Sequence, residues 1–261
     1  MELLLLLMVG AASGMIAGMI GFAGGIVVVP ALTWMFGIGA LHDAIIVSWF
    51  AVLFNSAVAA LRQYQVRLPE ERAAILACSR YYLVGAMLVV PIAAIALNTA
   101  KHLVTPQIVG VLYVCLALGM LMPVHEMEAA AKPRPWLETI SGGIIGGVSA
   151  VIGVGGGTYT IAYFVYVAKL RFQDAIAVAN LNGAIIGTLS VAGYVLSLMV
   201  PSGDEAVSSS PISAFGMNIL IMGGAAFAPL GVRLSRRMPT KILRRLLVLA
   251  ILVSALRMLA I

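Results

Sequence analysis

The sequence predicts an all-α integral membrane protein built from two inverted repeats, each a Gly-broken re-entrant hairpin followed by three transmembrane helices. Of its 261 residues, 62% are hydrophobic and only 10% are charged, and the mean hydropathy is +1.08. A soluble domain is nearer half apolar and a quarter charged. Apolar units long enough to cross a bilayer recur along the whole chain. Two of these units are interrupted by glycine clusters that lie 132 residues apart.

Eight hydrophobic units define the expected elements. They are residues 3–36, 44–61, 73–97, 103–123, 137–165, 172–200, 212–231 and 242–261. The first and the fifth run for about 30 residues, which is about 45 Å as a straight helix against a hydrocarbon core of about 30 Å. Each of these two carries its glycine cluster in the middle. We therefore expect both units to turn at their glycines and to return to the side from which they entered.

The charges of the loops favour this topology. Lysine and arginine residues in short loops are biased to the cytoplasmic side of a membrane. If all eight units cross, the loop cations divide seven to five between the two sides. If the two Gly-broken units are re-entrant, the cations divide eleven to one, with Lys101 as the exception. This second model places loops 62–72, 124–136, 166–171 and 232–241 in the cytoplasm, and loops 37–42, 98–102 and 201–211 outside.

The same model divides the chain into two repeats of opposite orientation, with both termini on the non-cytoplasmic side. The first repeat is 1–123, the cytoplasmic linker is 124–136, and the second repeat is 137–261. The hairpins are 3–36 and 137–165, and the transmembrane helices are 44–61, 73–97, 103–123, 172–200, 212–231 and 242–261. The leucine-rich start lacks a basic region and its apolar stretch continues to Phe36, so we interpret it as a retained helix and not as a signal peptide.

The glycine clusters are the first candidate site. They read Gly21-Phe-Ala-Gly24-Gly25 and Gly153-Val-Gly155-Gly156-Gly157, the second followed by Thr158. Glycine lets the backbone unwind, and the N–H groups at the start of the next half-helix carry partial positive charge that binds anions. A methyl group at Gly24 or Gly156 is then expected to fill the space of the anion. The alternative is close helix packing, which is the role expected of Gly14, Gly18, Gly142, Gly143, Gly146 and Gly147.

Polar residues in the middle of the spans form the second candidate group. They are Ser48, Asn55, Ser56, Asn180, Asn182 and Thr188. Ser48 and Asn55 are seven residues apart and share one helix face, and Asn180 and Thr188 roughly do the same. An amide in hydrocarbon needs a hydrogen-bond partner, which either a polar substrate or a neighbouring helix supplies.

Three ionisable residues complete the set of candidates. Arg80 lies about 12 Å along a helix from Arg72, so it either meets an anion at depth or extends its side chain back to the interface. Asp43 and Asp174 occupy corresponding positions in the two repeats, each just before a helix. We expect them to be N-caps, with a part in proton coupling as the alternative.

Several function classes are disfavoured. The chain shows no Ser-His-Asp set, metal-ligand cluster or phosphate-binding loop, so we expect no enzyme activity, cofactor or metal. The net charge of +6 resides in short loops, which argues against nucleic acid as a partner. The expected substrate site comprises Gly21, Gly24, Gly25, Ser48, Asn55, Arg80, Gly153, Gly155, Gly156, Gly157, Thr158, Asn180 and Asn182.

Four segments together resemble those of a known family. They are Gly21-Phe-Ala-Gly-Gly-Ile-Val-Val-Val-Pro30, Gly153-Val-Gly-Gly-Gly-Thr158, Asp43-Ala-Ile-Ile-Val-Ser48 and Pro229-Leu-Gly-Val-Arg233-Leu-Ser-Arg-Arg-Met-Pro239. In order and spacing they resemble the sulfite exporter TauE/SafE family of bacterial and archaeal permeases. Two features depart from its pattern. Ala162 stands where the first repeat has Pro30, and Asn180 and Asn182 stand where small or hydroxyl residues are usual, so the particular substrate stays open.

The resemblance implies a multi-pass protein of a prokaryotic inner membrane that moves small anions. Interrupted helices at corresponding positions of two halves point to the substrate site of a transporter. We expect a secondary transporter for a sulfur oxyanion, an organic sulfonate or a carboxylate, working by alternating access. A passive anion channel is the alternative, and a membrane scaffold or an intramembrane enzyme is disfavoured. A coupling proton or sodium ion, a homo-oligomeric state and the direction of transport are left open.

Overall fold

The computed structural model describes residues 2–21, 24–37, 41–99, 104–121, 134–199 and 213–260, and over these ranges it is entirely helical apart from short connections. The helices are α1 (Glu2–Ile20), α2 (Gly25–Phe36), α3 (Leu41–Gln65), α4 (Pro69–Thr99), α5 (Pro106–Leu121), α6 (Pro135–Val151), α7 (Gly157–Tyr166), α8 (Phe172–Leu198), α9 (Ala214–Arg237) and α10 (Thr240–Leu259). The all-α fold class is confirmed.

Five of the described helices are long and apolar enough to cross a membrane. They are Glu2–Ile20, Leu41–Gln65, Pro69–Asn98, Phe172–Leu198 and Ala214–Arg237. Helices α3 and α9 continue beyond the expected ends at residues 61 and 231 into polar sequence, because backbone hydrogen bonding does not stop where hydrophobicity stops. The chain is therefore a multi-pass membrane protein.

Both long hydrophobic units are broken at their glycines. Helix α1 ends at Ile20 and α2 begins at Gly25, while α6 ends at Val151 and α7 begins at Gly157. The N-cap of α2, Gly24, has φ 77° and ψ −20°, and the N-cap of α7, Gly156, has φ 79° and ψ −21°. These are left-handed conformations that side chains with a Cβ rarely adopt. The two breaks thus have the same local geometry.

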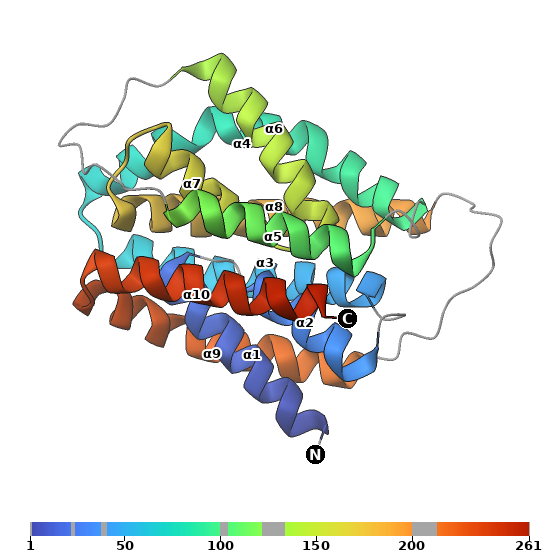
Figure 1. The fold of residues 1–261 in the computed structure, drawn as a ribbon. Coiled ribbons are helices and arrows are strands. Elements are labelled where there is room, and N and C mark those ends of the chain that lie inside the picture. Colours follow the sequence, from blue (N-terminus) through green and yellow to red (C-terminus); the bar gives the residue numbers. More distant parts are fainter. Residues whose placement is uncertain are drawn as a thin grey trace.

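Glycines also bring pairs of helices into close contact. Helix α1 packs along α9 and α6 packs along α4, at opposite edges of the bundle (Figure 1). A methyl group at Gly14 would overlap the backbone carbonyl of Gly224, and one at Gly142 would overlap that of Tyr82. A methyl group at Gly146 would press on the side chain of Val90. The packing role expected of these glycines is confirmed.

The helix contacts follow one pattern in both halves when α1–α5 are matched with α6–α10. The contact of α1 with α9 corresponds to that of α6 with α4, and the contact of α3 with α9 corresponds to that of α8 with α4. Helices α3 and α8 pack on each other, as do α5 and α10. This is the pattern that two related halves produce. Their opposite orientation in a membrane stays a prediction.

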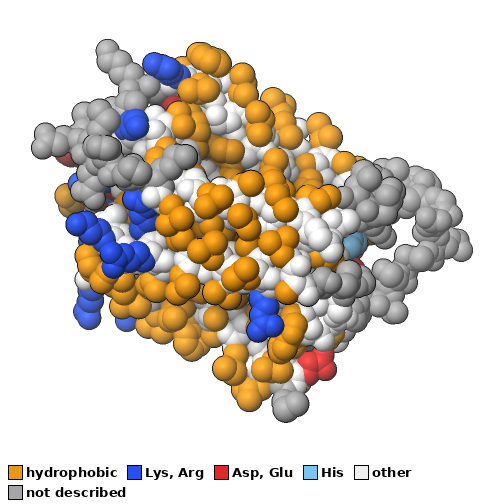
Figure 2. All heavy atoms as spheres, in the orientation of Figure 1, with side chains coloured by type: hydrophobic (Ala, Val, Ile, Leu, Met, Phe, Trp, Pro, Cys, Tyr) orange, Lys and Arg blue, Asp and Glu red, His pale blue; other side chains and the backbone are white. Residues whose placement is uncertain are grey.

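The loops separate into two groups at opposite ends of the bundle. Arg67 after α3 bonds to Asp174 at the start of α8, and Arg236 near the end of α9 donates to the Val66 carbonyl, so three predicted cytoplasmic loops meet. At the other end, Asn98 lies against both His42 and Ser197. Figure 2 shows arginine and lysine side chains gathered mainly at the first of these ends, which we call the loop end. The linker 124–136 lies mostly outside the described residues.

Candidate functional site

The two glycine breaks touch at the centre of the bundle. A methyl group at Gly25 would overlap the carbonyl oxygen of Gly153. Gly21 packs against Ile176 of α8, and Gly153 packs against Ile45 of α3. Each break therefore rests on the long central helix of the opposite half. This crossing places the starts of α2 and α7 in the same region of the protein.

Side chains of α3 hold the second break in place. The Ser48 hydroxyl lies 2.7 Å from the Gly153 carbonyl oxygen and 2.6 Å from that of Ile45, so its single proton is shared between two acceptors. The indole N–H of Trp49 donates to the Ala150 carbonyl at 2.9 Å. These bonds satisfy carbonyls at the frayed end of α6. Ser48 thus positions the backbone of the break and offers no spare donor to a ligand.

The first break is lined by an amide and a hydroxyl. The Asn55 amide nitrogen donates to the Ser13 hydroxyl at 2.9 Å, and both side chains are fully buried beside Gly24. The Asn55 carbonyl oxygen has no partner and faces Gly224. Ser13 was not among the residues expected from the sequence. Serine is common in membrane helices, so its position beside the break was visible only in the tertiary structure.

Both helices that leave the breaks begin without a cap. Neither Gly24 nor Gly156 makes a side-chain cap, since glycine has none to offer. Within the described part of the chain, the backbone N–H groups of Gly25 and Ile26, and those from Gly155 through Tyr159, have no hydrogen-bond acceptor. Free N–H groups at a helix start carry about half a positive charge. One such helix start therefore follows each of the two breaks.

Buried polar side chains near these helices also have no partner. Thr158, Asn180 and Asn182 are fully buried, and neither the Thr158 hydroxyl nor any polar atom of the two amides is hydrogen-bonded. An unpaired buried polar group costs about 1–3 kcal/mol. Asn180 lies one helical turn beyond Ile176, which packs on Gly21. A polar ligand beside any one of these groups would satisfy it.

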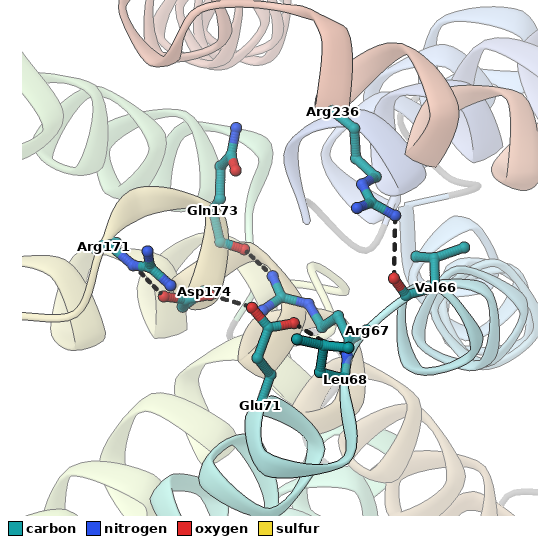
Figure 3. A network of polar contacts seen from close by, with 8 residues as sticks. All are labelled: Val66, Arg67, Leu68, Glu71, Arg171, Gln173, Asp174 and Arg236. Atoms are coloured by element: carbon teal, nitrogen blue, oxygen red, sulfur yellow. Dashed lines mark hydrogen bonds and ion pairs between the residues drawn. The ribbon is translucent and has the colours of Figure 1, made fainter.

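A cavity of about 350 Å³ opens at the loop end. Its wall includes Arg67, Asp174 and Arg236, and Ile176, which packs on Gly21, also lines it. Figure 3 shows the guanidinium of Arg67 directed at Asp174 and Gln173. The cavity therefore extends from the positively charged loop end to Ile176, the residue on which the first glycine break packs. In chemical terms, the arrangement offers cations at an entrance and neutral N–H donors at depth.

Comparison with known proteins identifies the family of the chain. The family model described as Sulfite exporter TauE/SafE matches residues 6–258. The chain belongs to this family. A "Probable membrane transporter protein" of Haemophilus influenzae is 25% identical over 203 residues, which is 75% of this chain and 74% of that protein. No solved structure matches the chain. The family and this relative indicate a membrane transporter.

In this TauE/SafE member, the structure separates Arg80 from the other expected site residues. Its side chain is exposed, and its guanidinium lies over the Tyr81 ring at 4.4 Å. Arg80 is absent from the lining of the loop-end cavity, where Arg67 takes the place that the sequence suggested for it. This placement favours the alternative in which Arg80 extends its side chain back to the membrane interface. Thr188 is also exposed and donates to the Ala184 carbonyl, so the expected face shared with Asn180 was wrong.

The expected N-cap role of Asp174 was also wrong. The N-cap of α8 is Arg171, with extended backbone, and Asp174 lies in the first turn of the helix. Its two carboxylate oxygens pair with Arg67 at 2.7 Å and Arg171 at 2.8 Å. The hydrogen bond and charge of Asp174 raise the pKa of Arg171. Asp43 likewise lies within the first turn of its helix, α3. Their corresponding positions in the two repeats predicted that both aspartates lie near a helix start, but did not predict which residues they contact.

The expected effect of a methyl group in the breaks needs a correction too. At Gly24 the added carbon would meet the Ser13 hydroxyl and the Asn55 amide, and at Gly156 it would meet the end of Ile186. The Cβ directions thus point at packed side chains and not at open space. A ligand would instead face the N–H side of the backbone.

Among the described residues, no group of three His, Cys, Asp or Glu side chains is placed to hold a metal.

Proposed function

We propose that this protein is a secondary transporter that moves a small anion by alternating access. The substrate class is a sulfur oxyanion, an organic sulfonate or a carboxylate. The observation that carries this proposal is that two uncapped helix starts, α2 and α7, follow glycine breaks that touch at Gly25 and Gly153. Helix starts bind anions through N–H groups and partial charge. Membership of the TauE/SafE family supports transport across a membrane.

Neutral donors suit a transport site because they bind an anion without holding it permanently. A fixed arginine at the centre would need a partner in the empty state, whereas N–H groups and amides cost less to leave open. Unwound backbone at depth is tolerated where it lies inside protein or lines a cavity. We assign the N–H groups of both breaks, Thr158, Asn55, Asn180 and Asn182 to substrate contact, with Ser48 as a positioning residue.

Alternating access would follow from motion of one half against the other. The halves meet along α1 and α9, along α4 and α6, and along α3 and α8, and each glycine break rests on the central helix of the opposite half. A rocking motion therefore changes which end of the bundle has access to the breaks. The cavity at the loop end supports this, because it reaches Ile176 beside the first break. We assign no coupling ion.

Flux into liposomes tests the proposal. The purified protein is reconstituted, and uptake of radiolabelled sulfite, methanesulfonate and acetate is measured with and without internal unlabelled anion. Saturable uptake that is accelerated by internal substrate is expected of a transporter. Uptake that does not saturate and shows no counterflow would assign a passive channel. No protein-dependent flux of any of these anions would refute the proposal.

A further inference from the structure

Among the described residues, one ion pair joins the two halves, an arginine–carboxylate pair at the loop end. Arg67 follows α3 in the first half, and Asp174 begins α8 in the second. The Arg67 guanidinium donates to the Asp174 carboxylate at 2.7 Å and to the Gln173 carbonyl at 3.1 Å (Figure 3). The other carboxylate oxygen accepts from Arg171 at 2.8 Å. One carboxylate is therefore held between two guanidinium groups.

This pair lies in the wall of the loop-end cavity, which Ile176 also lines. The Arg67 and Asp174 side chains are only 15% and 21% exposed. The other charged residues of the wall make different contacts. Arg236 donates to the Val66 carbonyl, and Glu71 accepts from the Leu68 N–H. Neither takes part in the Arg67–Asp174 pair. The charge of Glu71 also raises the pKa of Arg171, so two cations and two carboxylates lie in this wall, and of the two carboxylates only Asp174 bonds to the guanidinium groups.

The bound carboxylate has the chemistry of the proposed substrates. Guanidinium groups bind carboxylate, sulfonate and sulfite through the same charge-assisted N–H···O bonds. We infer that Arg67 is an anion-binding residue of the entrance cavity, that Asp174 occupies it in this conformation, and that an incoming anion of this class displaces Asp174 from Arg67. This inference rests on the proposed function. The exchange keeps the charge of Arg67 paired, and Asp174 keeps its bond to Arg171.

Displacement of Asp174 by an anion leaves the anion in the cavity and removes a bond between the two halves. Ile176 lies two residues beyond Asp174 on α8, lines the same cavity and packs on Gly21. An anion released from Arg67 is therefore already in the cavity lined by Ile176, the residue that packs on the first break. Displacing Asp174 also removes a direct bond between the two halves. Binding at the entrance would thus favour the motion that alternating access needs.

The two members of the pair give opposite results if Asp174 competes with the substrate. Binding of sulfite to the protein in nanodiscs is measured by isothermal titration calorimetry. Arg67→Gln removes the anion's partner and should weaken binding at least about tenfold, the equivalent of ~1.4 kcal/mol. Asp174→Asn removes the competitor and should bind sulfite as tightly as the parent or more tightly. Arg67→Lys keeps the charge and should lie between Arg67→Gln and the parent.

A purely structural ion pair predicts a different result. Both single variants would then change sulfite binding to the same extent, and that result would overturn the inference, as would weaker binding by Asp174→Asn. Arg62→Gln removes one positive charge from an exposed hydrogen bond to Gln65 and serves as the matched control, with unchanged binding expected. If the parent transports and Arg67→Gln binds sulfite as tightly as the parent does, the inference about Arg67 fails but the proposed function does not. If the parent neither binds nor transports any tested anion, the proposed function fails.

Discussion

At the scale of single residues, the left-handed backbone of Gly24 and Gly156 decides the geometry of the proposed site. Five glycines of the two breaks have positive φ, namely Gly21, Gly24, Gly153, Gly155 and Gly156. A residue with a Cβ pays roughly 1–2 kcal/mol in this conformation. The helix starts can therefore be disturbed by one methyl group, without any change of charge or polarity.

We expect Gly156→Ala to abolish anion binding while the protein still inserts into the membrane. The strained φ and the contact with Ile186 shift the start of α7, so its N–H groups no longer face the proposed anion site. Calorimetry with sulfite measures the loss. Gly146→Ala is the control, because its methyl group meets only Val90 and Ala86 within 3.5 Å and should lower the melting temperature while binding is retained.

A double variant separates the two causes of this effect. Ile186→Ala makes room for the methyl group at Gly156 but leaves its φ strained. We expect Gly156→Ala with Ile186→Ala to remain unable to bind. Recovery of binding would mean that side-chain packing, and not the left-handed turn, controls the site. If Gly156→Ala alone binds normally and only melts earlier, the breaks are packing features.

Arg80→Ala should leave transport within about twofold of the parent, as is usual for exposed positions. Its side chain is exposed and stacks on Tyr81, away from the cavity that contains Arg67. Sulfite uptake into liposomes, compared at equal amounts of inserted protein, measures the effect. A large loss of transport in this variant would restore Arg80 to the substrate pathway.

At the scale of elements, the second break is attached to α3 by hydrogen bonds whose contribution to stability can be stated. Ser48 and Trp49 bond to carbonyls at Gly153 and Ala150, and no other helix supplies these carbonyls with a side-chain donor among the described residues. A net hydrogen bond contributes about 1 kcal/mol, and a buried acceptor left unpaired costs more. The position of α7 therefore depends on α3 of the other half.

Ser48→Ala should lower the melting temperature by about 2–4 °C, the shift expected for ~1 kcal/mol in a chain of this size. The reason is that the Gly153 carbonyl loses its buried donor. Ser190→Ala is a matched control, since the Ser190 hydroxyl is buried without a partner and its removal should be neutral or stabilising. Equal melting temperatures for the two variants would contradict the role given to Ser48.

At the scale of the whole molecule, the grouping of loops supports the predicted topology. Loops 62–72, 166–171 and 232–241 meet at one end, through bonds of Arg67 to Asp174 and of Arg236 to Val66. Helix α1 begins and α10 ends toward the opposite end (Figure 1). This grouping is independent of the charge count that predicted it. Which end faces the cytoplasm stays a prediction.

Cysteine labelling of whole cells tests this orientation. After replacement of Cys78 and Cys115, single cysteines are placed at the exposed positions Gln65 and Gln107, at the loop end and at the start of α5. A membrane-impermeant maleimide should label Gln107→Cys in intact cells and Gln65→Cys only after permeabilisation. Labelling of both positions in intact cells would refute the hairpin topology and the inverted repeat with it.

The sequence by itself determined the membrane class, the all-α fold, the family and the positions of the two helix breaks. Hydrophobicity and glycine content are local properties, and they act on the few residues around them whatever the rest of the chain does. The same reasoning located Asn55, Thr158, Asn180 and Asn182, because a polar residue within an apolar run is conspicuous. It did not place Ser13, whose short side chain is unremarkable in a membrane helix.

Only the tertiary structure decided which of these residues meet. Arg67 and Asp174 are separated by 107 positions, and their pairing follows from the packing of α3 and α8, which no local pattern encodes. The structure likewise directed Arg80 outward, because helix rotation is set by neighbouring helices and not by the depth of a residue along its helix. The contact of Gly25 with Gly153 is of the same kind, since two local breaks touch only when the halves pack against each other.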